Sequence, residues 1–261
     1  MKIDGKTAMY AILGDPIAHV AAPRLMNAIF QESNENKVLI PFHVHDNGLQ
    51  SVVEGLKNIQ NFKGAVITMP HKTEIIKYVD EVSTEALRIG ACNVIKRTPD
   101  GLIKGTLLDG NGFIEGLKKY NYTLTEKHIF LLGAGGAAAA IAFALCENGI
   151  KKLTIYNRTD TKALLLIEKL KRFYPSIDIS YSNHISNDID VLINSTSVGM
   201  KISDKPVLSL TNLNPNTLVA DIITHPEITC TLQKAKELGC TIHTGIEMLE
   251  GQIKLIKEFM D

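Results

Sequence analysis

Apolar and polar positions along the chain follow two periods in turn, which predicts strands alternating with helices. Short apolar runs bounded by glycine, proline or polar residues are typical of buried strands, and apolar residues three and four apart predict helices. Strands are predicted at 10–13, 38–44, 64–68, 91–97, 128–132, 153–157, 179–181, 191–194, 218–221 and 241–243. Helices are predicted at 23–32, 49–58, 73–79, 112–120, 137–148, 163–173, 228–238 and 248–260.

This order of elements predicts an α/β fold with two domains. Strands that alternate with helices indicate βαβ units and mostly parallel sheets. The first series ends near Asp109, and the second contains an apolar strand that runs through a glycine turn into a helix. That sequence of elements is typical of a Rossmann-like, doubly wound sheet. A chain of 261 residues is long enough for both domains.

Composition and charge narrow the choice of partners. Hydrophobic residues make up 45% of the chain and charged residues 21%, and 28 basic residues balance 28 acidic ones. This balance gives no reason to expect nucleic acid or a membrane surface as a partner. The N-terminal residues lack a signal-peptide pattern, no apolar run is long enough to cross a bilayer, and no two cysteines form a CxxC pair. We therefore expect a cytoplasmic protein, either a monomer or a homodimer.

A glycine-rich turn predicts a dinucleotide site. The run Gly133-Ala134-Gly135-Gly136-Ala137-Ala138 lies between an apolar strand and a helix and fits the pattern G-x-G-x-x-A. Gly133 would allow the tight turn, Gly135 would let the backbone approach a pyrophosphate, and Ala138 would permit close packing of helix and strand. The N–H groups at the start of the helix would then bind the phosphates.

The next strand indicates NADP rather than NAD. An NAD site usually has an acidic residue at this strand end, which binds the ribose 2′-hydroxyl. Here the strand ends in Asn157-Arg158-Thr159, and Lys162 follows at the start of the next helix. A guanidinium group suits a 2′-phosphate. The one nearby acid, Asp160, is expected to cap the helix instead.

Four polar residues before the glycine turn lie near the ends of predicted strands or at the junction between the two series of elements. They are Thr68, Lys72, Asn93 and Asp109. The carboxyl ends of parallel strands line the ligand cleft of an open α/β sheet. A lysine and an aspartate that meet there could exchange a proton with an alcohol oxygen, while a nicotinamide exchanges a hydride with the carbon. From spacing alone, a surface position for both residues is the more common case.

The chain resembles the shikimate dehydrogenase family over nearly its full length. The order and spacing of several short runs carry this resemblance, although each run alone is loose. They are GDPIAH at 14–19, GAVITMPHK at 64–72, IGACN at 89–93, GTLLDGNG at 105–112, GAGGAA at 133–138, NRT at 157–159, NSTSVGM at 194–200 and GIEMLEGQ at 245–252.

The resemblance implies roles for individual residues. Lys72 and Asp109 match the catalytic pair, and Thr68, Asn93 and Gln252 match positions that bind the substrate. The cofactor positions are Gly133, Ala134, Gly135, Gly136, Ala137, Asn157, Arg158, Thr159 and Lys162, with Thr196, Val198, Met200 and Gly245 near the ribose and nicotinamide. It further implies a substrate-binding catalytic domain at 1–109, completed by a C-terminal helix at 245–261, and an NADP-binding domain at 110–244.

The departures from the family pattern fall around the substrate. Val20 and Ala22 stand where the family has two serines that bind the substrate carboxylate, and neither side chain can donate a hydrogen bond. Val66, the pair Leu107-Leu108 and Thr224 also replace the family's usual residues. The carboxylate could instead be held by His19, by Asn111 or by a backbone N–H.

These observations favour an NADP-dependent alcohol dehydrogenase that interconverts 3-dehydroshikimate and shikimate, or a close cyclic analogue such as quinate, in the chorismate pathway of aromatic amino acid biosynthesis. A cyclic hydroxy acid is the expected partner. A weak or regulatory NADP-binding paralogue is one alternative, and a methylene-tetrahydrofolate dehydrogenase, which the GTLLDGNG run fits less well, is another.

The histidines predict no metal site. His43, His45 and His71 do not show metal-ligand spacing with any acid. We expect His43 and His45 at a strand edge or on the surface, and His71 to shape the loop that carries Lys72.

Overall fold

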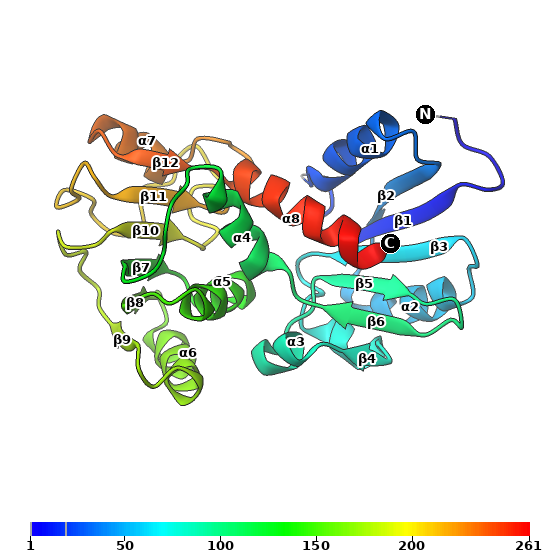
Figure 1. The fold of residues 1–261 in the computed structure, drawn as a ribbon, viewed down its shortest axis with the longest axis horizontal. Coiled ribbons are helices and arrows are strands. Elements are labelled where there is room, and N and C mark those ends of the chain that lie inside the picture. The colour runs from blue at the N-terminus through cyan, green and yellow to red at the C-terminus, as the bar shows by residue number, and fades with distance from the viewer. Residues whose placement is uncertain (1, 19) are drawn as a thin grey trace. The chain divides into compact units, whose positions relative to one another are not determined.

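The structure, a computed structural model, describes residues 2–18 and 20–261. The chain forms two compact units, Met1–Leu108 with Gln252–Asp261, and Asp109–Gly251 (Figure 1). The elements of the first unit are β1 (Ala8–Gly14), α1 (Ala22–Glu32), β2 (Lys37–His43), η1 (Asp46–Gly48), α2 (Leu49–Lys57), β3 (Phe62–Ile67), η2 (Glu74–Tyr78), β4 (Glu81–Val82), α3 (Thr84–Ile89), β5 (Val94–Arg97) and β6 (Ile103–Thr106). They are followed by α4 (Asp109–Lys118), β7 (His128–Leu132), α5 (Gly136–Glu147), β8 (Lys152–Tyr156), α6 (Asp160–Phe173), β9 (Asp178–Tyr181), β10 (Val191–Asn194), β11 (Leu218–Asp221), α7 (Cys230–Glu237), β12 (Thr241–His243) and α8 (Gly245–Met260).

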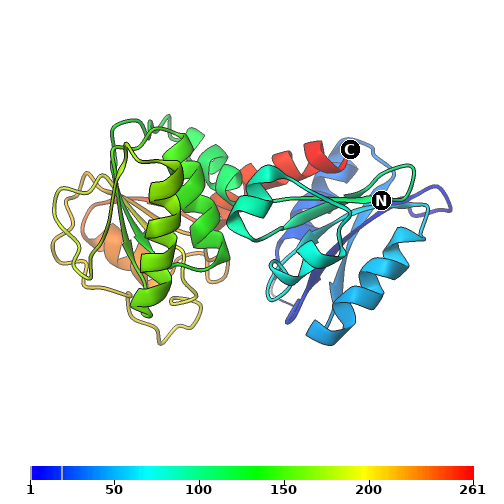
Figure 2. The ribbon, with the colours of Figure 1, turned by 90° about the horizontal axis from the view of Figure 1, so that it is seen from below.

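The first unit contains a sheet with the strand order β2-β1-β3-β5-β6-β4. β1 is parallel to both β2 and β3, and β4 is parallel to β6, whereas β5 runs antiparallel to β3 and β6. The connection through α1 leads from β1 outward to β2, and the connection through α2 leads from β2 back past β1 to β3. Right-handed crossovers in these opposite directions place α1 and α2 on opposite faces of the sheet (Figures 1 and 2). Met26 and Phe30, four residues apart, are the buried stripe of α1.

The second unit is a doubly wound sheet with the strand order β12-β11-β10-β7-β8-β9, and its strand pairs are parallel. This order reverses between β7 and β10, which is the Rossmann arrangement. α5 and α6 cover one face and α7 covers the other (Figure 2). Every residue of β7 is buried, as expected for the central strand of a parallel sheet.

The alanine-rich helix α5 is buried on more than one side. Ala138 and residues 140–146 are buried, because α5 packs against both the sheet and the neighbouring helix α4. A Cβ on Gly110 would lie 2.2 Å from the carbonyl oxygen of Ala140 and 2.8 Å from the Cβ of Ala144. Only glycine at position 110 permits this close approach of the two helices.

The last helix begins in one unit and ends in the other. Thr244 and Glu247 form a capping box, in which the Thr244 N–H donates to the Glu247 carboxylate at 2.7 Å. A Cβ on Gly251 would lie 2.6 Å from the Gly112 oxygen, so the start of α8 packs on α4. This packing explains why the first unit resumes at Gln252 rather than at the expected residue 245. The other boundary lies between Leu108 and Asp109, one residue before the expected position.

The differences from the predicted elements are short or lie at ends. η1, β4, α3 and β6 were not predicted; each has two to six residues and lacks a clear apolar run or hydrophobic period. The predicted helix at 73–79 is the 3₁₀ helix η2, the strand predicted from residue 91 begins at Val94, and the helix predicted from residue 112 begins at Asp109. Among the described residues, no helix is long and apolar enough to cross a membrane.

Candidate active site

The loops after β1 and β3 are joined at the carboxyl end of the first sheet. The Thr68 N–H donates to the Leu13 oxygen at 2.9 Å, and the Asp15 N–H donates to the Met69 oxygen at the same distance. A Cβ on Gly14 would lie 2.4 Å from the Cγ2 of Thr68, so position 14 must be glycine for Thr68 to sit there. Thr68 is half-buried and is therefore within reach of a ligand.

Backbone hydrogen bonds fix Lys72 and Asn93 at the same end of this sheet. The Cys92 N–H donates to the Lys72 oxygen at 2.7 Å, and the Ile67 N–H donates to the Asn93 oxygen at 2.7 Å. Asn93 is 1% exposed, and its Oδ1 accepts the N–H of Leu108 at 2.7 Å. The next residue, Asp109, is buried and begins α4.

His71 shapes this loop, as expected. It is 1% exposed, and its Nε2 is 2.7 Å from the backbone oxygen of Val44. The imidazole therefore links the segment that carries Lys72 to the segment that follows β2. Gln252, the remaining predicted substrate residue of this unit, is buried in α8.

The region expected to bind a carboxylate presents no hydroxyl at the two departure positions. Val20 is half-buried, and Ala22 is a buried first residue of α1. Within the described residues, the N-cap Ala21 makes no side-chain capping bond and the first turn holds no acid. Asn111 is half-buried in the first turn of α4, and His19 lies outside the described residues.

The glycines of the turn at residues 133–136 differ in the space that surrounds them. Gly133 adopts φ +115°, and a Cβ there would lie 2.7 Å from the Ser195 Oγ, so the fold itself requires glycine. A Cβ on Gly135 or Gly136 would meet no described atom within 4 Å. The space beside these two residues is open, at the start of the twelve-residue helix α5, where a phosphate group could approach the backbone. Ala137 is half-buried and Ala138 is fully buried, as close packing of helix and strand requires.

The end of β8 exposes positive charge. Arg158 and Lys162 are exposed, on either side of the first residue of α6. The Asn157 Nδ2 donates to the Thr159 oxygen at 2.9 Å, which shapes the turn. Asp160 does not cap the helix as expected. It is the first helical residue, and its carboxylate instead accepts the Tyr181 hydroxyl at 2.8 Å, which raises the pKa of Tyr181 to about 12.

A buried network supports the stretch after β10. The Thr196 hydroxyl donates to the Asn194 Oδ1 at 2.8 Å and accepts the Val198 N–H at 3.1 Å. The Asn194 Nδ2 donates to the Asp221 carboxylate at 2.8 Å, and the Thr229 hydroxyl donates to the same oxygen at 2.7 Å. Burial raises the pKa of Asp221 to about 6, although these hydrogen bonds oppose the rise. The network positions Thr196 and Val198, whereas Met200 is 40% exposed at the end of the stretch.

The comparisons with known proteins decide the family. The shikimate dehydrogenase substrate binding domain family matches residues 12–95, and the shikimate / quinate 5-dehydrogenase family matches residues 115–239. A shikimate dehydrogenase (NADP(+)) of Nitrosopumilus maritimus (strain SCM1) is 39% identical over 251 residues, which cover 95% of this chain and 90% of that protein. The chain belongs to the shikimate dehydrogenase family.

Solved structures of similar sequence share the fold. Shikimate 5-dehydrogenase of Thermus thermophilus, in complex with NADP(H) and shikimate, superposes with a TM-score of 0.88 at 29% identity, covering 97% of this chain and 93% of that one. The ligand-free 5-ketofructose reductase of Gluconobacter sp. strain CHM43 superposes with a TM-score of 0.90 at 29% identity, covering 98% and 94%.

These matches confirm the predictions of family, two-domain α/β fold and cofactor. The chain is an NADP-dependent oxidoreductase of the shikimate dehydrogenase type. Neither the regulatory alternative nor the folate alternative gains support from the similar proteins.

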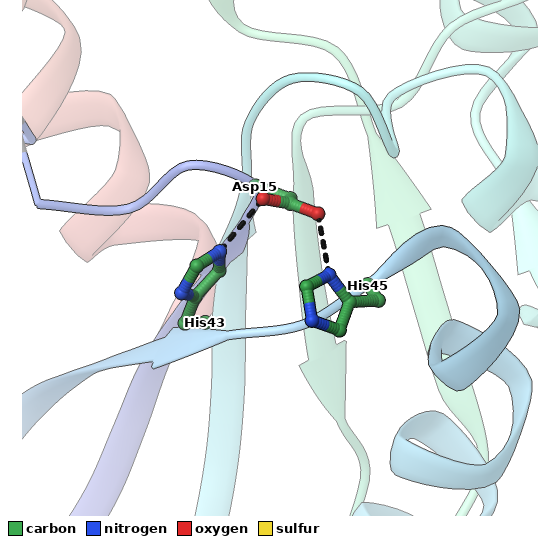
Figure 3. Close-up of side chains that lie close together, drawn as sticks. All are labelled: Asp15, His43 and His45. Atoms are coloured by element: carbon green, nitrogen blue, oxygen red, sulfur yellow. Dashed lines mark hydrogen bonds and ion pairs between the residues drawn. The ribbon is translucent and has the colours of Figure 1, made fainter.

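Two features of this shikimate dehydrogenase family member were missed in the sequence. The first is the network of Asn194, Asp221 and Thr229, which joins residues far apart along the chain. Its one signal in the sequence was that each of two neighbouring apolar strands ends in a polar residue, Asn194 and Asp221. The second is an acid between His43 and His45. Asp15, from another segment, lies between them, so the expectation that no acid accompanies these histidines is wrong (Figure 3).

Proposed function

We propose that this chain interconverts a cyclic hydroxy ketone of the 3-dehydroshikimate kind and the corresponding alcohol, in the chorismate pathway and in the cytoplasm. The observation that carries the proposal is the hydrogen-bonded set around Asn93. It fixes the backbone of Lys72 and the N–H of Leu108, the residue before Asp109, at the carboxyl end of one sheet.

Lys72 and Asp109 are proposed as the acid–base pair. In reduction the Lys72 ammonium gives a proton to the carbonyl oxygen, and in oxidation the neutral amine takes it from the hydroxyl. Asp109 is proposed to orient the ammonium group by the attraction between the two opposite charges. NADPH, when bound, would supply the hydride to the carbonyl carbon, so that the ketone, NADPH and one proton would give the alcohol and NADP⁺.

Thr68, Asn93 and Gln252 are proposed to bind the ring hydroxyls. All three are polar residues of the first unit that are half-buried or buried, and hydrogen bonds to partly buried polar groups discriminate strongly between substrates. A substrate that lacks the matching hydroxyl would forgo these hydrogen bonds.

The cofactor is proposed to lie along the carboxyl end of the second sheet. The turn at residues 133–137, with open space beside Gly135 and Gly136, would hold the pyrophosphate, and the turn at residues 157–159 with Lys162 would hold the 2′-phosphate. Thr196, Val198, Met200 and Gly245 would border the ribose and nicotinamide.

The substrate is proposed to depend little on a carboxylate. A charge-assisted hydrogen bond contributes roughly 1.5–3 kcal/mol. Loss of two serine hydroxyls at positions 20 and 22 therefore weakens shikimate binding by about two to four orders of magnitude. The similarity to a 5-ketofructose reductase supports this reading, since a keto sugar carries no carboxylate.

A substrate panel tests this proposal. Initial rates with shikimate, quinate, shikimate methyl ester and carboxylate-free cyclic polyols are measured with NADP⁺ and with NAD⁺, and the corresponding ketones with NADPH. We expect NADP(H)-dependent turnover, and a kcat/KM for the ester or a polyol that equals or exceeds that for shikimate. An ordinary micromolar KM for shikimate, with no turnover of the uncharged compounds, contradicts the proposed specificity. Absence of turnover across the whole panel contradicts the activity. Sedimentation of the same preparation distinguishes monomer from homodimer.

A further inference from the structure

Three potential metal ligands lie close together where the neighbouring parallel strands β1 and β2 of the first sheet end. Gly14, the last residue of β1, lies opposite His43, the last residue of β2. Asp15 follows the first strand, and His45 follows the second. Two adjacent parallel strands therefore bring a carboxylate and two imidazoles to one corner of the sheet (Figure 3).

The side chains are already directed at one another. The His43 Nε2 is 2.7 Å from one oxygen of Asp15, and the His45 Nδ1 is 2.8 Å from the other oxygen. One ligand atom from each of the three residues lies within 4.8 Å of the other two. The side chains of His43 and His45 are 52% and 77% exposed, so a solvated ion can reach them.

The backbone beneath these side chains is fixed by buried groups. The Val44 N–H donates to the Gly14 oxygen at 3.1 Å, and the Val44 oxygen contacts the buried imidazole of His71. The Asp15 N–H donates to the Met69 oxygen. An ion would therefore have to order only three side chains, not the chain that carries them, which lowers the entropic cost of binding.

The set of donor atoms selects a class of ion. Two imidazole nitrogens and one carboxylate oxygen are typical ligands of Zn²⁺, and related borderline ions accept them as well. Bonds of about 2.0–2.1 Å in a tetrahedral site place neighbouring ligand atoms roughly 3.3 Å apart. Each of the two hydrogen-bonded separations would widen by about half an ångström. They involve different oxygens of Asp15, and the ligand atoms of the three residues lie within 4.8 Å of one another, so side-chain rotations would also have to close the remaining separations. Mg²⁺ prefers an octahedral set of oxygens and does not suit this site.

An ion would take the place of the two hydrogen bonds to Asp15, because the atom of a metal ligand that binds the ion carries no proton. Without an ion, the same three groups form a hydrogen-bonded surface triad.

We propose that Asp15, His43 and His45 bind a divalent cation of the Zn²⁺ class through three protein ligands, with a fourth position open to solvent. The ion would join Asp15, which follows β1, to the end of the edge strand β2. The site takes no part in the acid–base chemistry proposed for Lys72 and Asp109, and it stands whether or not the proposed substrate is correct.

Metal titration of the untagged full chain tests the site. The protein is stripped with EDTA and dialysed, then titrated with Zn²⁺ by calorimetry and with Co²⁺ by visible absorption, which reports tetrahedral coordination. We expect one equivalent to bind with low micromolar affinity, a rise in thermal midpoint on adding Zn²⁺, and no effect of millimolar Mg²⁺.

Variants locate the binding. Asp15→Asn, His43→Gln and His45→Gln should each weaken Zn²⁺ binding about tenfold or more. His184→Gln changes another exposed histidine and should bind as the parent does. Circular dichroism and thermal midpoints in EDTA show that each variant is folded, as expected for exposed side chains. No binding by the parent chain, or binding that all three variants retain, overturns the proposal.

Discussion

The side chain of Asn93 accepts the backbone N–H of Leu108 at 2.7 Å, one residue before Asp109. A single buried amide thus holds the segment that leads into the proposed acid–base residue. The same residue is bonded through its own backbone to β3 and β6. Asn93 therefore holds these backbone segments together, in addition to the substrate contact proposed for it.

Replacing Asn93 by alanine should lower stability as well as activity. The Leu108 N–H loses its partner in a buried setting, which costs about 1–3 kcal/mol. Urea denaturation measures this change, and kcat/KM should fall in parallel. Asn58→Ala removes an exposed amide that bonds to the Glu54 oxygen, and its stability should stay within about 0.5 kcal/mol of the parent. Parent-like stability of Asn93→Ala would show that the bond to Leu108 is dispensable.

Lys72→Ala and Asp109→Asn should each lower kcat by about 10²–10⁴-fold, because each removes part of the acid–base pair. The dissociation constant for NADP⁺, measured by fluorescence titration, should remain near that of the parent. Lys77→Ala is the matched control, since Lys77 is an exposed lysine paired with Glu74 in the same loop region. If NADP⁺ binding is lost instead of turnover, the role given to Lys72 is wrong.

Restoring the two hydroxyls should restore shikimate binding. In Val20→Ser/Ala22→Ser, the KM for shikimate should fall by roughly 10²–10⁴-fold, if each serine contributes about 1.5–3 kcal/mol. The KM for a carboxylate-free analogue should stay unchanged, which makes that compound the internal control. An equal change for both compounds would mean that the substitutions act on the loop and not on the carboxylate.

Arg158→Ala should weaken NADP⁺ binding by about 10- to 100-fold and leave NAD⁺ binding unchanged, since only NADP⁺ carries the 2′-phosphate. Arg172→Ala removes an exposed arginine at the other end of α6, where it pairs with Glu168, and should change neither affinity. Equal losses for both dinucleotides would assign Arg158 to some other part of the cofactor.

Asp221 should give the protein a component of stability that falls as pH rises. Its pKa is raised from 3.8 to about 6, so between these values the folded state binds more protons than the unfolded state. This contribution is complete below about pH 4 and is lost as pH rises through 6, and it amounts to roughly 3 kcal/mol.

Asp221→Asn removes that component. The free energy of unfolding of the parent minus that of the variant should decrease between pH 4.5 and 6.5, when both are measured by urea denaturation. Asp178→Asn, at an exposed position at the start of β9, should show no such trend. A difference that does not vary with pH would mean that Asp221 titrates near its ordinary value.

Much of the fold could be predicted from the sequence, because many of its helices and strands show their pattern within a few consecutive residues. The apolar run of β7, the glycine turn and the alanine-rich α5 each display their structure within a few residues. The sequence failed where the deciding contact joins distant segments. Asp15 and the pair His43 and His45 are separated by almost the whole of α1 and β2, so only the parallel register of β1 and β2 shows that they meet. The prediction that Asp160 caps α6 failed because the hydrogen-bond partner of its carboxylate, Tyr181, lies on β9 and cannot be recognised from the residues around position 160.

The helix α8 has a consequence for how the protein is made. Residues 252–261 belong to the unit that is otherwise built from the first 108 residues, and Asp261 bonds to Tyr10 and Lys37 there. During translation, the first unit must therefore remain incomplete, with part of its apolar surface uncovered, until the second unit has been synthesised. Of the two units, the one that begins earlier along the chain is in this way completed later.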